Sequence, residues 1–336
     1  MNRPNRPKAA GYGLSWLLAG RVGKLLPAVI QIPSKPPAID YSAPYLPISR
    51  TLPEGDVLKF CQHTPDGLET ESVIIPMGAR ENTWRTLCVS SQIGCARGCT
   101  FCQTAQMGLL RNLTTDEILG QIRAARMHFG ADIRNVVFMG MGEPMDNLDA
   151  VIASIIAMHE DREHQIPRRR ITVSTVGRCD GIRRLGAYGW RRLNLAISLN
   201  APNDEIRSQI MPINRAEPMA RLREAIADFP VRAGGHVLIE YVAIAGLNDQ
   251  PDHALELVEY LRGLPTVVNL IPYNPRQDST FEVPSEETLV AFQALVMAQG
   301  QLIFRRNTKG RSVMAACGQL GNPGARTSRL SIQMTL

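Results

Sequence analysis

Short runs typical of β-strands alternate with helical segments along most of this chain, and this alternation restricts the fold more than any other feature of the sequence. The strand-forming runs are residues 86–90, 135–139, 171–174, 193–198, 237–242 and 267–271. Apolar residues at helical spacing occupy 115–129, 148–159, 219–229 and 252–262. This order predicts an α/β fold with parallel strands joined by right-handed crossovers. Since too few units are visible for a closed eight-fold barrel, we expect a partial (β/α)6 barrel, with a doubly wound open sheet as the alternative.

Composition divides the chain into four regions. Residues 1–52 form a basic arm rich in proline, which we expect to be poorly packed. Residues 53–80 hold two apolar runs, 57–61 and 72–75, and the turn signal Thr64-Pro65-Asp66-Gly67 between them predicts a small β-hairpin. The core of the partial barrel is expected over 81–311, and a C-terminal segment follows over 312–336.

The excess positive charge is confined to the arm. The 336 residues carry 37 Lys and Arg against 31 Asp and Glu, yet no acidic residue precedes Asp40, so the body of the chain is neutral. A basic tail indicates contact with RNA phosphates or a disordered start, and the apolar run at 15–19 is too brief for a signal peptide. Because the apolar stretches fall short of the roughly 18–20 residues of a membrane span, we expect a soluble, cytoplasmic protein with no membrane partner.

Three of the seven cysteines lie close together in the pattern Cys95-x3-Cys99-x2-Cys102. Soft thiolates select iron–sulfur clusters or zinc. A structural zinc site needs four ligands, and no fourth Cys or His follows at zinc-finger spacing, whereas a cluster held by three thiolates leaves one iron open to a small molecule. The pattern therefore favours a cluster and a reducing compartment.

The sequence around these cysteines resembles a known family. The run Cys99-Thr-Phe-Cys102 is similar to the signature of radical S-adenosylmethionine enzymes, whose 4Fe-4S cluster holds that cofactor at its open iron. Further blocks, in the same order, resemble the RlmN/Cfr family of RNA adenine carbon methyltransferases: Thr86-Leu-Cys-Val-Ser-Ser-Gln-Ile-Gly-Cys95, Arg111-Asn-Leu-Thr114, Asn135-Val-Val-Phe-Met-Gly-Met-Gly-Glu-Pro144, Ser198-Leu-Asn-Ala-Pro-Asn-Asp204, Asn269-Leu-Ile-Pro-Tyr-Asn-Pro275 and Ala315-Ala-Cys-Gly-Gln-Leu320. The resemblance covers residues 71–320.

The resemblance implies a radical mechanism through a methylated cysteine. Cys317 would receive a methyl from one S-adenosylmethionine, and a radical generated from a second would activate that methyl for addition to adenine. Cys88 would remove the ring proton and attack the sulfur of Cys317, leaving a transient disulfide. Glu71 matches the proton acceptor of the family. Cys61 and Cys179 have no such context and are expected to be buried core residues.

The resemblance also implies the ligands and partners. One 4Fe-4S cluster would be held by Cys95, Cys99 and Cys102, and the cofactor would contact Gly142, Glu143, Ser174, Ser198, Leu199, Asn200 and Asn274. The substrate would be an adenosine of 23S rRNA, with tRNA as a further substrate, methylated at carbon 2 in preference to carbon 8. A flavodoxin- or ferredoxin-type electron donor and a thiol reductant such as thioredoxin are implied as partners. Paired arginines at 168–170, 183–184, 191–192 and 305–306 are candidate RNA contacts, with solvated surface as the alternative.

Three features depart from the family. The Pro-rich arm stands where the family carries a helical accessory domain, so we expect the arm to replace part of its RNA contact. Asn200 stands where the family usually has His, and the link over 77–84 between Glu71 and Cys88 is long. Two competing hypotheses remain: a radical enzyme with another substrate, and a non-enzymatic iron–sulfur protein that binds RNA or carries electrons. The second leaves Cys88 and Cys317 without a use.

Overall fold

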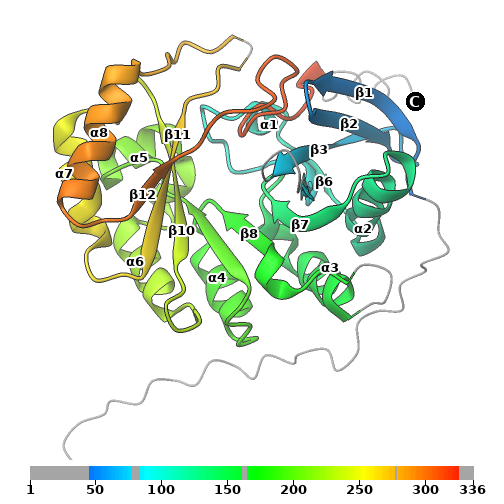
Figure 1. The fold of residues 1–336 in the computed structure, drawn as a ribbon, viewed down its shortest axis with the longest axis horizontal. Coiled ribbons are helices and arrows are strands. Elements are labelled where there is room, and N and C mark those ends of the chain that lie inside the picture. The colour runs from blue at the N-terminus through cyan, green and yellow to red at the C-terminus, as the bar shows by residue number, and fades with distance from the viewer. Residues whose placement is uncertain (1–44, 78–83, 161–164, 277, 325–336) are drawn as a thin grey trace, which may run out of the picture. The chain divides into compact units, whose positions relative to one another are not determined.

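The computed structural model describes residues 45–77, 84–160, 165–276 and 278–324 (Figure 1). The main sheet has the strand order β1-β2-β3-β4-β7-β8-β9-β10-β11-β12. Its strands are β1 Ile48–Glu54, β2 Val57–His63, β3 Glu69–Met77, β4 Trp84–Cys88, β7 Ile133–Phe138, β8 Ile171–Thr175, β9 Asn194–Ser198, β10 Val237–Ala243, β11 Thr266–Pro272 and β12 Ile303–Arg305. A separate small sheet pairs β5 Gln92–Gly94 with β6 Leu109–Asn112.

The strands from β4 onward pair in parallel and follow one another across the sheet in sequence order. A doubly wound sheet would reverse its direction of growth at a switch point, and this sheet does not. The expected partial barrel is therefore confirmed, and the doubly wound alternative does not hold. All six predicted strands are present, and β12 adds a short seventh parallel strand beside β11.

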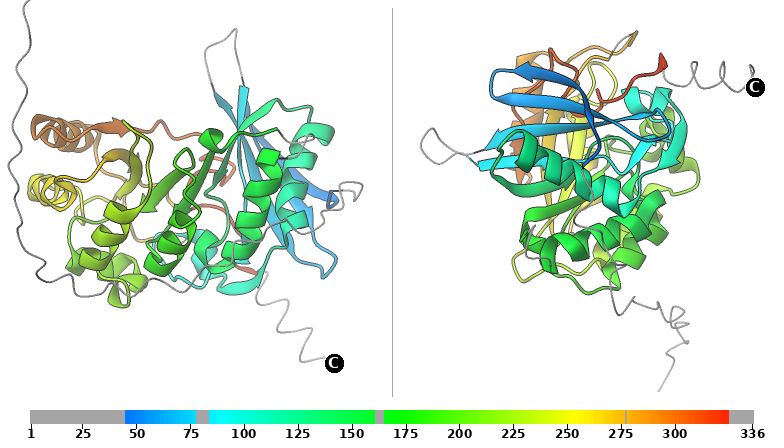
Figure 2. Two further views of the ribbon diagram at one scale, coloured as in Figure 1. Left: turned by 90° about the horizontal axis from the view of Figure 1, so that it is seen from below. Right: turned by 90° about the vertical axis from the view of Figure 1, so that its right-hand side faces the viewer.

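The helices lie outside the curved sheet (Figures 1 and 2). They are α2 Thr115–Arg123, α3 Leu148–Glu160, α4 Cys179–Gly186, α5 Asp204–Ile210, α6 Met219–Asp228, α7 Pro251–Leu261 and α8 Glu286–Ala298, with the short α1 Gln103–Gln106 in the cysteine loop. The predicted helix over 115–129 divides, because α2 passes into a π-helical turn at Ala124–His128. No helix within the described ranges is long and apolar enough to cross a membrane.

Three antiparallel strands extend the barrel sheet at its β4 edge. Strands β2 and β3 form the expected hairpin around the turn at 64–67, and β3 pairs with β4. Strand β1 pairs with β2, so the end of the segment that was expected to be poorly packed is in fact ordered from Ile48. The backbone N–H and C=O groups of β1 find hydrogen-bond partners in β2, and this pairing orders the strand although it contains a proline. Residues 1–44, where most of the basic arm and its predicted RNA contact fall, lie outside the described residues.

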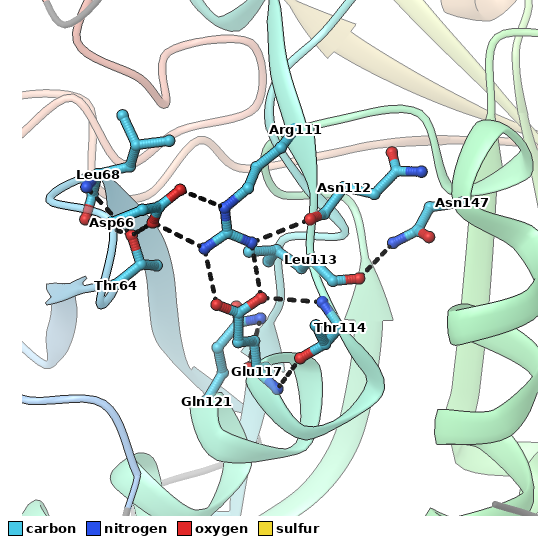
Figure 3. A network of polar contacts seen from close by, with 10 residues as sticks. All are labelled: Thr64, Asp66, Leu68, Arg111, Asn112, Leu113, Thr114, Glu117, Gln121 and Asn147. Carbon is cyan, nitrogen blue, oxygen red and sulfur yellow. Dashed lines mark hydrogen bonds and ion pairs between the residues drawn. The ribbon is translucent and has the colours of Figure 1, made fainter. Parts of the chain in front are cut away.

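One arginine ties the hairpin turn to the first barrel helix (Figure 3). Arg111 donates to both carboxylate oxygens of Asp66, at 2.8 and 3.1 Å, and to both of Glu117, at 2.8 and 2.7 Å. Glu117 also completes a capping box with Thr114 at the start of α2. This network accounts for the Arg111-Asn-Leu-Thr114 block as a structural element that joins the extension to the barrel.

Candidate active site

A cavity opens at the carboxyl ends of the parallel strands, where barrel enzymes build their sites. It brings together most of the site residues that the sequence predicts. These are Cys95, Cys99, Cys102, Gly142, Glu143, Ser174, Ser198, Asn200 and Cys317.

The three clustered cysteines lie in one loop between β5 and α1. Cys95 and Cys99 are buried, and burial raises the pKa of the Cys95 thiol to about 12 and also raises the pKa values of Cys99 and Cys102. Within the described part of the chain, no three His, Cys, Asp or Glu side chains converge closely enough for a single metal ion. A 4Fe-4S cluster held by three thiolates leaves one iron open to a small molecule, so three thiols that line one cavity suit it. The donor set therefore fits a 4Fe-4S cluster.

Glu143 supplies a buried carboxylate beside this loop. Its two oxygens accept hydrogen bonds from the backbone amides of Met145 (3.0 Å) and Val176 (2.8 Å), which join the ends of β7 and β8. Burial is the main cause that raises its pKa to about 7. A cationic amino group in the cavity would favour the charged form. Glu143 thus suits the amino group of S-adenosylmethionine.

Glycines let the chain turn closely against β5 just before Glu143. Gly142 has φ of +100°, and a Cβ atom there would lie 2.5 Å from the Cβ of Gln92. The side chain of Gln92 in turn accepts a hydrogen bond from the backbone amide of Glu143 at 2.8 Å. A larger residue at Gly142 would displace the carboxylate, so this glycine positions Glu143.

Of the remaining predicted cofactor contacts, Ser174, Ser198 and Asn200 line the first cavity and Leu199 does not. Ser174 and Ser198 line the cavity, and neither hydroxyl has a hydrogen-bond partner among the described residues. Asn200 has φ of 58°, a conformation that Asn tolerates better than most residues, and its side-chain oxygen accepts from Val242 N at 2.9 Å. Leu199 is buried and does not line the cavity, so its cofactor contact stays a prediction.

Cys317 lies where two cavities meet. It lines the cavity of the three cysteines and also a second one, which contains Cys88 on β4. The second cavity combines an apolar lining with six polar or basic side chains, namely Asn269, Asn274, Arg306, Asn307, Thr308 and Lys309. Burial, together with the neighbouring Cys317, raises the pKa of the Cys88 thiol to about 12. The two cysteines that the sequence pairs are therefore near one another.

The segment that carries Cys317 is held against the cysteine loop. It crosses from β12 past α1 towards β1 and β2 (Figure 1). The amide of Gln103 donates to Gly318 O at 2.7 Å, and the hydroxyl of Thr104 donates to Leu320 O at 2.6 Å. Because these donors directly follow Cys102, the position of Cys317 is tied to the loop that would hold the cluster.

Besides Leu199 and Cys88, the predicted residues Asn274 and Glu71 also lie outside the first cavity. Asn274 lines the second one and donates to the backbone carbonyl of Cys317. Glu71 lines neither cavity: it forms a buried ion pair with Lys59, with 2.7 Å between Oε2 and Nζ. Its role as a proton acceptor stays a prediction.

One further charged residue of the first cavity was not predicted from the sequence. Glu240 lines the first cavity from β10, where burial raises the pKa of its carboxyl and Asn269 donates to it at 2.7 Å. An acid inside the apolar run Val-Leu-Ile-Glu-Tyr-Val was the available signal. Arg306 lines the second cavity, whereas its neighbour Arg305 pairs with Glu286 at 2.6 Å.

Several of the other paired arginines are engaged in structural contacts. Arg168 lies 4.6 Å from the ring centre of Trp190, and Arg184 pairs with Asp149. Arg183 approaches Asp180 and Glu224 at 3.8 and 3.7 Å. Of the predicted arginine clusters, only Arg306 lines either of the two cavities.

The chain is similar to a known superfamily and to known RNA methyltransferases. The model of the radical SAM superfamily matches residues 89–258. A relative from Protochlamydia amoebophila, described as a probable dual-specificity RNA methyltransferase RlmN 1, is 47% identical over 278 residues, which are 83% of this chain and 76% of the relative. The dual-specificity RNA methyltransferase RlmN of Marinobacter nauticus is 44% identical over 81% of this chain and 74% of its own length.

A solved structure agrees with these relatives. The crystal structure of a radical SAM methyltransferase from Sphaerobacter thermophilus superposes with a TM-score of 0.77 at 40% identity. The match covers 82% of this chain and 81% of that one. The likeness thus includes most of the described fold.

Proposed function

The chain belongs to the RlmN family of radical S-adenosylmethionine RNA methyltransferases, and we propose that it methylates an adenosine through an S-methyl group on Cys317. The proposed position is carbon 2, with carbon 8 as the alternative. The proposed substrate is 23S rRNA, with tRNA as a second substrate. One observation carries the proposal: Cys317 lines both the cavity of the three cysteines and the cavity of Cys88.

The first cavity would hold the methyl source. A 4Fe-4S cluster and S-adenosylmethionine, when bound, supply a methyl group and the one-electron chemistry that an aromatic carbon requires. Cys95, Cys99 and Cys102 would hold the cluster, and Glu143 would bind the amino group of the cofactor through a charge-assisted hydrogen bond. Ser174 and Ser198 line the same cavity and offer hydroxyls, without hydrogen-bond partners in the described part of the chain, for its other polar groups.

The second cavity would receive the adenosine. A base must leave its stack to reach a buried site, at a cost of a few kcal/mol in a duplex and less in a loop. Arg306 and Lys309 offer positive charge to phosphates, and Asn269 offers an amide to a base edge. We assign the RNA-facing side of the reaction to this cavity.

Cys88 would complete the reaction from the second cavity. It would take the proton from the ring carbon, the unpaired electron left by the radical addition would return to the bound cluster, and the Cys88 sulfur would then bond to the sulfur of Cys317 as the bond from that sulfur to the transferred carbon breaks and this carbon takes up a proton. The product leaves with its methyl, and the protein holds a Cys88–Cys317 disulfide. A thiol reductant such as thioredoxin would restore both thiols, and a flavodoxin- or ferredoxin-type donor would supply electrons, which suits a reducing cytoplasm.

Nucleoside mass spectrometry tests the proposed product. rRNA and tRNA from cells with and without the gene are digested and compared. Loss of 2-methyladenosine in the deletion strain, with return on complementation, is expected. Loss of 8-methyladenosine would move the position to carbon 8, and unchanged adenosine methylation in both RNA classes would refute the proposal.

A further inference from the structure

The two residues of the Lys59–Glu71 ion pair each form a hydrogen bond with the backbone of the segment that carries Cys317, one before and one after that cysteine. The ammonium group of Lys59 donates to the carbonyl oxygen of Met314 at 3.1 Å. The carboxylate of Glu71 accepts from the backbone amide of Gly321 at 3.0 Å. Met314 and Gly321 lie before and after Cys317 in the chain, so the pair fixes the loop at two points.

The pair is built into the antiparallel extension. Lys59 faces Val73 and Cys61 faces Glu71 in the β2–β3 register, so Lys59 and Glu71 are diagonal neighbours on one face. Diagonal neighbours are within reach of long side chains. Their side chains are only 6% and 4% exposed, so water screens the ion pair little.

The backbone of this segment has an unfavourable dihedral angle at Met314 and is closely packed at Gly321, so contacts that fix it are required. Met314 has φ of 51°, in the left-handed region that residues other than glycine rarely adopt. Gly321 has φ of +116°, and a Cβ atom there would lie 2.6 Å from the sulfur of Met107. The segment is therefore held in an unfavourable conformation at one end and pressed against the cysteine loop at the other.

We infer that Lys59 and Glu71 are positioning residues that hold Cys317 at the junction of the two cavities. Glu71 acts through the backbone of the segment, in place of a direct proton transfer. The antiparallel strands β2 and β3 thus serve the reaction as a fixed support for the C-terminal segment. This inference rests on the proposed function for its consequence in methyl transfer, and on the contacts alone for its effect on the segment.

Three variants separate positioning from the alternatives. Lys59→Met keeps the carboxylate but removes the donor to Met314. Glu71→Gln keeps an acceptor for Gly321 but leaves a buried cation without its partner. The double variant Lys59→Met/Glu71→Leu replaces the pair by apolar side chains, which can restore the stability lost by breaking a buried ion pair. Glu69→Gln is the matched control, because Glu69 lies on the same strand and pairs with Arg50.

Two measurements on the cluster-loaded protein test whether Lys59 and Glu71 position Cys317. Hydrogen exchange of peptides covering 309–321 reports the hold on the segment without any reaction. Mass spectrometry of the Cys317 peptide after incubation with S-adenosylmethionine reports methyl loading. We expect faster exchange in the variants and about 100-fold slower loading, since small misplacements of reacting groups carry penalties of that size. The affinity for S-adenosylmethionine should be unchanged, and Glu69→Gln should behave as the wild type.

The outcomes are distinguishable. Slow loading that persists in the double variant after its thermal midpoint has recovered supports positioning. Normal exchange and loading in Lys59→Met would overturn the inference, as would recovery of loading together with stability. Normal loading in Glu71→Gln with blocked RNA product would also overturn it, in favour of proton transfer. If wild-type Cys317 takes up no methyl while the segment still loosens in the variants, the proposed function fails and the structural hold stands.

Discussion

The side-chain amide of Asn274 donates a hydrogen bond to the backbone carbonyl of Cys317, with 3.2 Å between the two atoms. The side-chain oxygen of Asn274 accepts from Arg311 at 3.3 Å, so its orientation is fixed from both sides. The sequence placed Asn274 among the cofactor contacts, and it lines the second cavity instead of the first. Its contact with the backbone of Cys317 gives it a direct part in placing that thiol.

Replacing Asn274 by Asp tests which of these two roles it plays. The carboxylate cannot donate to the Cys317 carbonyl, and losing one such hydrogen bond should slow methyl loading of Cys317 by about tenfold. Binding of S-adenosylmethionine, measured by calorimetry on the cluster-loaded protein, should stay unchanged. Weaker cofactor binding with a normal loading rate at saturation would return Asn274 to the cofactor contacts.

Removing the thiol of Cys88 should trap the RNA. In Cys88→Ala no second thiol can attack the sulfur of Cys317, so the bond between that sulfur and the transferred carbon should persist. Denaturing gels should then show a protein–RNA adduct that the wild type does not accumulate. Cys61→Ala is the control, since Cys61 is buried on β2 outside both cavities. Free methylated RNA at the wild-type rate from Cys88→Ala would contradict the assigned role.

Neutralising Glu143 should weaken cofactor binding. Glu143→Gln keeps the shape of the side chain but loses the charge that we propose pairs with the amino group of the cofactor, and hydrogen bonds to charged groups contribute about 1.5–3 kcal/mol. The dissociation constant for S-adenosylmethionine should rise by about 10- to 100-fold. The absorbance of the cluster should be unaffected. A dissociation constant equal to that of the wild type would remove Glu143 from the site.

Asp66 should make stability depend on pH in the acid range. Hydrogen bonds from Arg111 are the main cause that lowers the pKa of Asp66 from 3.8 to about 2. A depressed carboxyl pKa contributes stability that is present above the unfolded value and is lost as the pH falls through the folded value. That contribution should therefore disappear between about pH 4 and about pH 2.

Urea unfolding of wild type, Arg111→Met and Asp66→Asn over this range measures the contribution of Asp66. Asp66→Asn removes this contact alone, whereas Arg111→Met also removes the partner of Glu117, so Asp66→Asn against the wild type gives the contribution of Asp66. Both variants should be less stable at neutral pH and should lose less stability on acidification. Because the Asp66 side chain is 41% exposed, the effect should be modest. Equal acid dependence in all three would show that the contact contributes nothing.

The barrel could be predicted because its signals are local. Parallel strands such as those of 171–175 and 237–243 read as apolar β-rich runs, and helices such as α3 and α7 carry their own periodicity. Strand β1 was missed because its sequence is rich in polar residues, and only pairing with β2 orders it. The sequence of a strand does not identify the strand with which it pairs.

The site could be predicted only as far as its motifs extend. The three cysteines, Glu143 and Cys317 lie in recognisable blocks, and the structure brings them around one cavity. Lys59 has no motif, and its contact with Met314 joins residues 255 positions apart in the chain. Arg305 and Arg306 were predicted together as a candidate RNA contact, yet Arg305 at the end of β12 pairs with Glu286, and only Arg306 lines the second cavity. Such long-range contacts follow from the fold and not from local sequence.

The most direct test of the account is whether Cys317 itself carries the methyl group. The purified, cluster-loaded protein is incubated with S-adenosylmethionine bearing a deuterated methyl, a reductant and substrate RNA, and both the Cys317 peptide and the RNA nucleosides are weighed over time. The label should appear on Cys317 before it appears in methyladenosine, and Cys317→Ala should show neither while keeping the absorbance of its cluster. Labelled methyladenosine formed by Cys317→Ala, or by a wild-type protein whose Cys317 never gains the label, would contradict the account.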